Sequence, residues 1–137
     1  MTVKNAESAA PDVVVFTYGR VTAAVSEAAA LSGKNVKIVK LIKVHPLDPQ
    51  MIVREAEGAK AILVVEEGIK CGGIGESIAS LLCENGVFAP VKIHAIDTFA
   101  KHGSLSELFS MFGFTGEYIA KEIAELAESG AKDDGNC

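Results

Sequence analysis

Short apolar segments alternate with helix-forming segments along this chain, and this alternation constrains the fold more than any other feature. The predicted strands are residues 13–17, 36–44, 61–65 and 91–96, and the predicted helices are residues 22–31, 49–57, 76–84, 104–111 and a last helix that starts after Thr115. Strands that are separated by helices form a parallel sheet with right-handed crossovers and helices on both faces. The sequence therefore predicts an α/β fold, a three-layer α/β/α sandwich with a mostly parallel sheet of about five strands.

Capping residues mark several of the predicted helix boundaries. Asp48 precedes Pro49, whose missing N–H is harmless in the first turn of a helix. Gly33 follows the first helix as a stop signal, and Ser104-Leu105-Ser106-Glu107 has the spacing of a capping box. Thr115 caps the last helix, whose apolar stripe consists of Tyr118, Ile119, Ile123 and Leu126.

The 137 residues suffice for one hydrophobic core. We expect residues 12–128 to form one domain between two flexible segments, residues 1–11 and 129–137. The net charge of -5 disfavours nucleic acid as a partner, and no apolar run approaches the roughly 20 residues that a membrane-spanning helix needs. The sequence thus predicts no nucleic-acid partner and no membrane.

Cysteine and histidine positions point to neither a disulfide framework nor a metal site. Cys71, Cys83 and Cys137 are odd in number and form no C-x-x-C pair, which favours the reducing cytoplasm. Cys71 is either a reactive thiolate or an inert loop cysteine. The three histidines lack metal-ligand spacing, and His94, in the middle of a predicted strand, is expected to be a hydrogen-bonded structural residue.

Most residues with functional potential lie in the four loops that follow the predicted strands. Ligands and partners of parallel sheets bind at the carboxyl ends of the strands. We therefore predict docking or ligand-binding loops there, and we assign no catalytic, cofactor-binding or metal-binding residue. The candidates are Tyr18, Gly19, His45, Asp48, Glu66, Glu67, Gly72, Gly73, Gly75, Asp97 and His102.

The glycine-rich loop at residues 68–75 has two possible meanings. A loop between a strand and a helix can bind phosphate through its backbone N–H groups. The spacing here matches neither the dinucleotide-binding nor the Walker motif, and the neighbouring Glu66 and Glu67 would repel an anion. The alternative is a backbone that bends tightly or approaches a neighbour closely. Adjacent strand residues point to opposite sides, so the two glutamates are not expected to act on one substrate atom.

A hydrolase interpretation is the weakest one that the residues allow. Residues 75–79 nearly match G-x-S-x-G around Ser77, and Asp97 and His102 follow in the chain order of a catalytic triad. However, Ala79 replaces the last glycine of the motif. Ser77 also lies about ten residues beyond its strand, and the chain is too short for that fold.

Taken together, the loops resemble the C-terminal domain of the transketolase superfamily, most closely that of the 1-deoxy-D-xylulose-5-phosphate synthase family. The resemblance spans about residues 12–126, and the Pro-Leu-Asp and Glu-Glu-Gly elements are also similar to the pyruvate dehydrogenase beta chain. The matching pieces are Thr17-Tyr18-Gly19, Pro46-Leu47-Asp48, Val65-Glu66-Glu67-Gly68, Gly72-Gly73-Ile74-Gly75 and Asp97-x-Phe99-x-x-His102-Gly103-Ser104.

This resemblance implies a part of a larger enzyme. Such enzymes transfer a two-carbon unit with thiamine diphosphate and magnesium, which bind between two other domains, so the resemblance implies no cofactor on this chain alone. It implies a docking and dimer-supporting module, a homo-oligomer, and thiamine-binding domains or subunits as partners. Two alternatives stay open: a stand-alone regulatory module that binds a small anion or metabolite, and a subunit of the 2-oxo acid dehydrogenase beta-chain type.

Overall fold

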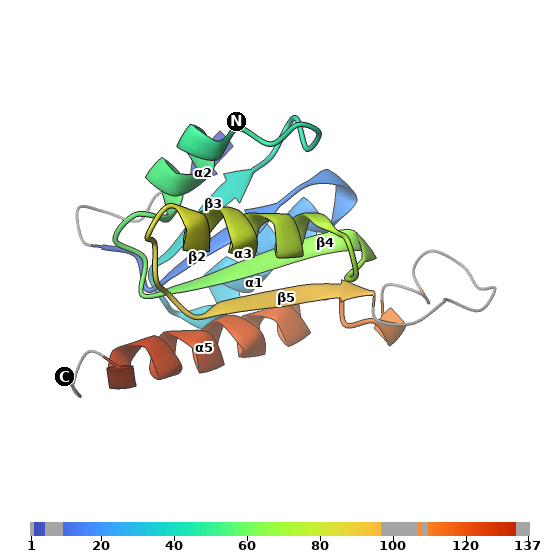
Figure 1. Ribbon diagram of the computed structural model, residues 1–137. Coiled ribbons are helices and arrows are strands. Elements are labelled where there is room, and N and C mark those ends of the chain that lie inside the picture. The colour runs from blue at the N-terminus through green and yellow to red at the C-terminus, as the bar shows by residue number, and fades with distance from the viewer. Residues whose placement is uncertain (1, 5–9, 97–106, 108–109, 134–137) are drawn as a thin grey trace.

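A computed structural model describes residues 2–4, 10–96, 107 and 110–133 of the chain. Its centre is a sheet of five strands, and Figure 1 shows how the helices lie around it. The strands are β1 (Thr2–Lys4), β2 (Val13–Thr17), β3 (Val36–Lys40), β4 (Ala61–Ile69) and β5 (Val91–Ile96). Their order is β1-β3-β2-β4-β5, with β1 antiparallel to β3 and all other pairs parallel. The predicted α/β class and strand number are confirmed.

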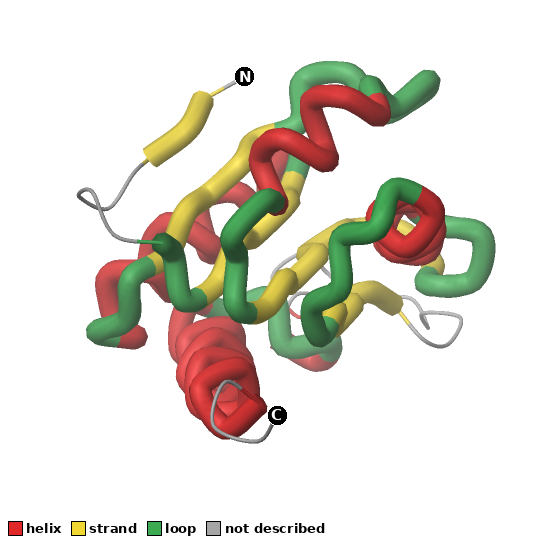
Figure 2. The backbone as a smooth tube through the Cα atoms, turned by 60° about the vertical axis from the view of Figure 1, so that its left-hand side comes forward, coloured by secondary structure: helices red, strands yellow, loops and turns green. Residues whose placement is uncertain are grey.

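Helices cover both faces of the sheet, as the three-layer prediction requires. The described elements are the short 3-10 helix η1 (Gly19–Val21) and the helices α1 (Thr22–Ser32), α2 (Pro49–Ala56), α3 (Ile74–Glu84) and α5 (Gly116–Asp133). Helices α1 and α5 lie on one face and α2 and α3 on the other (Figure 2). Among the described helices, none combines the length and the apolar character needed to span a bilayer.

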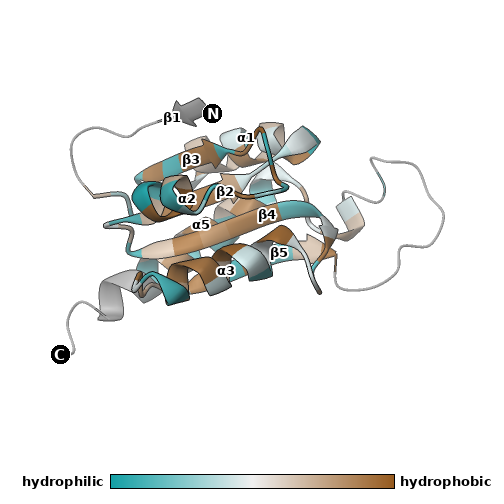
Figure 3. Cartoon of the chain, turned by 45° about the horizontal axis from the view of Figure 1, so that its top comes forward, coloured by the Kyte–Doolittle hydropathy of each residue, from teal (hydrophilic) through white to brown (hydrophobic). Residues whose placement is uncertain are grey.

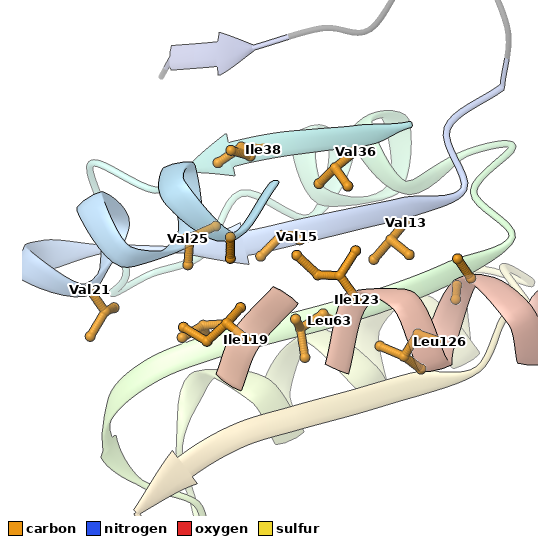
Figure 4. Close-up of a cluster of buried hydrophobic side chains, with 14 of the residues drawn as sticks. Val13, Val15, Val21, Val25, Val36, Ile38, Leu63, Ile119, Ile123 and Leu126 are labelled. Atoms are coloured by element: carbon orange, nitrogen blue, oxygen red, sulfur yellow. The ribbon is translucent and has the colours of Figure 1, made fainter. Parts of the chain in front are cut away.

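Strand β2 is buried on both faces because its side chains alternate between two hydrophobic clusters. Val13 and Val15 pack against α1 and α5, whereas Val14 and Phe16 pack toward α2 and α3. The β4 strand alternates in the same way, and its colouring in Figure 3 is hydrophobic along most of its length. Figure 4 shows the cluster on the α5 side, including Val13, Val15, Val25, Ile38, Leu63, Ile119, Ile123 and Leu126.

Three of the predicted helix caps are confirmed. The N–H of Met51 donates to Oδ1 of Asp48 at 3.2 Å, and the N–H of Tyr118 donates to Oγ1 of Thr115 at 3.3 Å. Gly33 ends α1 with a left-handed φ of 66°. The predicted capping box at residues 104–107 falls largely outside the described residues.

Two strands differ in length from the prediction, and their neighbours explain both differences. Strand β3 ends at Lys40 because β2 ends opposite it, at Thr17, so the residues beyond have no strand to pair with. Strand β4 continues through the two glutamates to Ile69 because β5 offers further pairing, Ile69 with Ile96, across an irregularity in the register.

Regular structure occurs within both terminal segments, residues 1–11 and 129–137, whose flexibility stays a prediction. Residues Thr2–Lys4 form β1, which pairs with β3, and α5 continues to Asp133. A helix can continue without an apolar stripe where the residues favour helix, as Ala131 and Lys132 do. Tyr118 also departs from the predicted stripe, since 53% of it is exposed.

The α5 face of the core should be sensitive to the loss of side-chain volume. Ile123 is fully buried against the sheet, so we expect Ile123→Ala to lower the free energy of unfolding by about 2–5 kcal/mol. The exposed Leu31 offers a control, because Leu31→Ala should cost only about 0.5 kcal/mol or less. Urea denaturation measures both values, and equal losses would contradict the described position of α5.

Candidate docking site at the carboxyl edge

The carboxyl ends of β2, β3 and β4 meet at one edge of the sheet, to which we refer as the carboxyl edge (Figure 1). The structure brings Tyr18, Gly19, Glu66, Glu67 and the glycine-rich loop together at this edge. His45 and Asp48 lie in the loop between β3 and α2, where His45 is exposed and Asp48 caps α2. The remaining candidates, Asp97 and His102, lie outside the described residues.

Glu66 is buried beneath the start of α3. Only 1% of the residue is exposed, and its Oε2 accepts a hydrogen bond of 2.6 Å from the N–H of Gly75. Burial raises the pKa of Glu66 above its usual value, the backbone N–H groups of Gly75 and Ile74 oppose this shift, and the nearby Glu76 adds to it. The Glu66 carboxyl thus occupies the helix N-terminus, where an anion could otherwise bind.

Two glycines are required by the close approach of this loop to its neighbours. A Cβ atom on Gly73 would overlap the Glu66 carboxyl and lie 2.7 Å from the carbonyl oxygen of Ile69. A Cβ on Gly75 would lie 2.6 Å from the side chain of Ile93 on β5. Glycine is therefore the residue that fits at both positions.

Glu67 binds the loop on the other side of β4. Its Oε1 accepts hydrogen bonds from the N–H groups of Arg20, at 2.7 Å, and Val21, at 3.2 Å. The Arg20 side chain reaches Oε2 at 3.3 Å, in an ion pair whose arginine side is largely exposed. Gly19 precedes these donors with a φ of +70°, which favours glycine. Sequence reasoning missed Arg20, although it directly follows Gly19.

The two adjacent carboxylates therefore hold two different loops, and we call them the glutamate clamp. Glu66 binds the first turn of α3, at the end of the glycine-rich loop, and Glu67 binds η1 between β2 and α1. This arrangement confirms that adjacent glutamates on the strand point to opposite sides. Tyr18 lies near both, and its pKa is raised first by burial and then by the charges of Glu66 and Glu67.

The glycine-rich loop uses its backbone donors internally. The N–H of Gly75 binds Glu66, that of Gly72 binds Oε2 of Glu76 at 2.9 Å, and that of Gly73 binds the carbonyl of Lys70 at 3.1 Å. Carboxylates already occupy the places that a phosphate would take. Of the two meanings open from the sequence, the structure supports the tightly bent backbone.

The hydrolase interpretation finds no support among the described residues. Ser77 lies in the first turn of α3, where its hydroxyl donates to the carbonyl of Gly73 at 3.3 Å, rather than on a sharp turn directly after a strand. Its expected partners Asp97 and His102 lie outside the described residues. Cys71 is an exposed free cysteine.

A buried polar cluster links β5 to α5. His94 is 7% exposed; its Nε2 donates to the carbonyl of Phe112 at 2.7 Å, and its Nδ1 is hydrogen-bonded to Oε1 of Glu122. Lys92 lies 3.7 Å from Oε2 of Glu122. The prediction that His94 is a hydrogen-bonded structural residue is confirmed. Glu122 was missed, although a glutamate between the buried Ile119 and Ile123 is a recognisable signal.

The fold and the edge define a class: a three-layer α/β domain whose strand-end loops are held by its own carboxylates. Residues 4–119 match the family described as "Transketolase, C-terminal domain". The chain belongs to this family, as the resemblance in its loops indicates.

Several similar proteins are 1-deoxy-D-xylulose-5-phosphate synthases. The one from Heliobacterium modesticaldum is 34% identical over 122 residues, which cover 86% of this chain and 19% of that protein. The one from Dehalococcoides mccartyi strain 195 is 32% identical over 121 residues, covering 84% and 19%. The chain therefore spans about a fifth of the length of these relatives.

A solved structure titled "Split gene transketolase, inactive beta4 tetramer" has the same fold. The TM-score is 0.75 at 22% sequence identity, and the match covers 94% of this chain and 42% of the other.

The buried carboxyl of Glu66 should make stability depend on pH. Its pKa is raised in the folded state, so the stability that its proton contributes is complete below the ordinary value of 4.5 and is lost as pH rises through the folded pKa. Glu66→Gln carries no such proton. We expect the variant to gain stability relative to the wild type between about pH 4 and about pH 7. Urea denaturation across this range measures the difference, and the reverse trend would contradict the assignment.

Removing the Glu67 carboxylate should release η1. Glu67→Ala deletes acceptors for two backbone donors, and hydrogen bonds to charged groups contribute about 1.5–3 kcal/mol. We expect amide hydrogen exchange at Arg20 and Val21 to accelerate about tenfold or more. Arg20→Ala is the matched control, because it removes the exposed ion pair and leaves both backbone bonds in place. Unchanged exchange in Glu67→Ala would show that the clamp does not hold this loop.

Proposed function

We propose that this chain is the C-terminal domain or subunit of a thiamine diphosphate-dependent enzyme of the transketolase type, most similar to 1-deoxy-D-xylulose-5-phosphate synthase. Its role is to dock onto the thiamine-binding part of the enzyme and to support assembly of the dimer. The observation that carries this proposal is the glutamate clamp: the charged groups at the edge where a ligand would bind hold the chain's own backbone. These carboxylates therefore stabilise the surface of the domain, and in this proposal the catalytic residues belong to other domains.

Thiamine diphosphate and magnesium belong to the presumed full assembly. The residues of this chain do not fit the diphosphate at the carboxyl edge, because carboxylates occupy the backbone donors of Gly72 and Gly75. Within the described residues there is also no group of three acidic, histidine or cysteine side chains that could hold a metal ion. The same occupied donors disfavour the alternative of a stand-alone module that binds a small anion.

The similar structure is described as a split gene transketolase that forms a β4 tetramer. A separate subunit that associates with copies of itself is therefore a reasonable state for this chain, and we propose a homo-oligomer. A subunit of the 2-oxo acid dehydrogenase beta-chain type stays an alternative, and the cytoplasmic location stays a prediction.

The test is co-expression of this chain with the thiamine-binding chain encoded in the same genome. We expect the two to co-purify and to transfer a two-carbon unit from pyruvate when thiamine diphosphate and magnesium are supplied, whereas this chain alone should be inactive. Each chain alone, assayed with the cofactor, serves as the control. Turnover by the isolated chain, or failure of the two chains to associate, would contradict the proposal.

A further inference from the structure

The described acidic side chains of the carboxyl-edge loops are engaged within the domain. Asp48 caps α2, Glu66 and Glu67 form the clamp, and Glu76 accepts the N–H of Gly72. Each of these carboxylates therefore has a backbone partner within the domain, while it keeps its negative charge.

Two lysines at the same edge lack such partners. Lys43 and Lys70 are exposed, and within the described part of the chain neither ammonium group forms a hydrogen bond or an ion pair. These two exposed ammonium groups can therefore pair with a partner's carboxylates, although the chain as a whole carries a net charge of -5.

Each of these lysines follows an exposed isoleucine. Ile42 is 77% exposed just beyond the end of β3, and Ile69 is 50% exposed at the end of β4. Strands β3 and β4 are the two neighbours of β2, so the two Ile-Lys pairs lie on either side of the loop that follows β2. We call Ile42, Lys43, Ile69 and Lys70 the Ile-Lys rim.

The rim flanks a loop that the glutamate clamp holds in place. Glu67 fixes η1 between the two pairs, and Lys70 belongs to the loop whose far end is bound by Glu66. A surface that is ordered before binding pays less conformational entropy when a partner arrives. Exposed apolar groups can be buried at the centre of an interface, and charged groups around them can steer the encounter with a partner.

We propose that the Ile-Lys rim docks onto an acidic surface with apolar side chains on the thiamine-binding part of the enzyme. This inference rests on the proposed function and adds the location and chemistry of the contact. About four-fifths of the relatives' length lies outside the region that matches this chain, so a large partner surface is expected. A second copy of the chain is a poor occupant of this rim, because a symmetric contact between two rims would bring like-charged lysines together.

The experiment compares charge-reversal variants in binding to the thiamine-binding chain encoded in the same genome, by titration calorimetry at low and high salt. We expect Lys43→Glu/Lys70→Glu to weaken binding at low salt by about tenfold or more, and the loss to shrink at high salt. The control Lys34→Glu/Lys121→Glu changes the net charge equally at exposed positions away from the rim and should bind like the wild type. Ile42→Ser/Ile69→Ser should weaken binding at both salt concentrations.

The outcomes separate this inference from the proposed function. If the wild type associates with the thiamine-binding chain and the rim variants bind equally well, the inference is wrong and the proposed function stands. Equal losses in the rim and control variants would indicate a general charge effect and would also overturn it. If the rim variants changed only the association of the chain with itself, a second copy would be the occupant of the rim and the inference would be wrong. If the wild type does not associate, both proposals fail. Thermal denaturation should show that the variants remain folded.

Discussion

Two neighbouring carboxylates at the end of β4 organise the functional edge of this domain. Because successive strand residues face opposite sides, Glu66 and Glu67 can bind different loops while sharing one backbone. The extension of β4 to Ile69 is what makes this possible, since it carries both glutamates within the strand. The loops after β2 and after β4 are thereby fixed relative to each other through a rigid element.

The two carboxylates of the glutamate clamp differ in how far they are removed from water. Glu66 is buried and its pKa is raised. The stability gained from its hydrogen bonds is therefore reduced by the free energy of removing a carboxyl group from water. Glu67 keeps part of its side chain in contact with solvent and has two backbone donors. A buried carboxyl that holds a glycine-rich loop favours one loop conformation over others, and this specificity is a reason for a domain to retain it.

The sequence predicts the fold well where local signals decide it. The apolar run of residues 13–17, the Asp48-Pro49 start of α2 and the Thr115 cap each carry their own physical cause, and the structure agrees with them. The ends of β3 and β4 could not be predicted, because pairing with β2 and β5 sets them. The rule that ligands and partners bind at the carboxyl ends of parallel strands predicted the candidate edge. The alternation of side chains along a strand predicted that the two glutamates point to opposite sides. Neither rule could predict which backbone donors the glutamates bind, or which partners Arg20 and Glu122 contact, because these partners are distant in sequence.

The two polar centres of the domain differ in what they can contribute to an assembly. The cluster of His94 and Glu122 ties β5 to α5 and lies inside the fold, so it supports the domain itself. The glutamate clamp lies at the edge, and its carboxylates face inward, whereas the lysines around it are exposed. Beside acids that bind backbone donors of the domain, Lys43 and Lys70 leave two ammonium groups for a partner's carboxylates. The availability of these two groups follows from where the fold places them, since the overall composition is acidic.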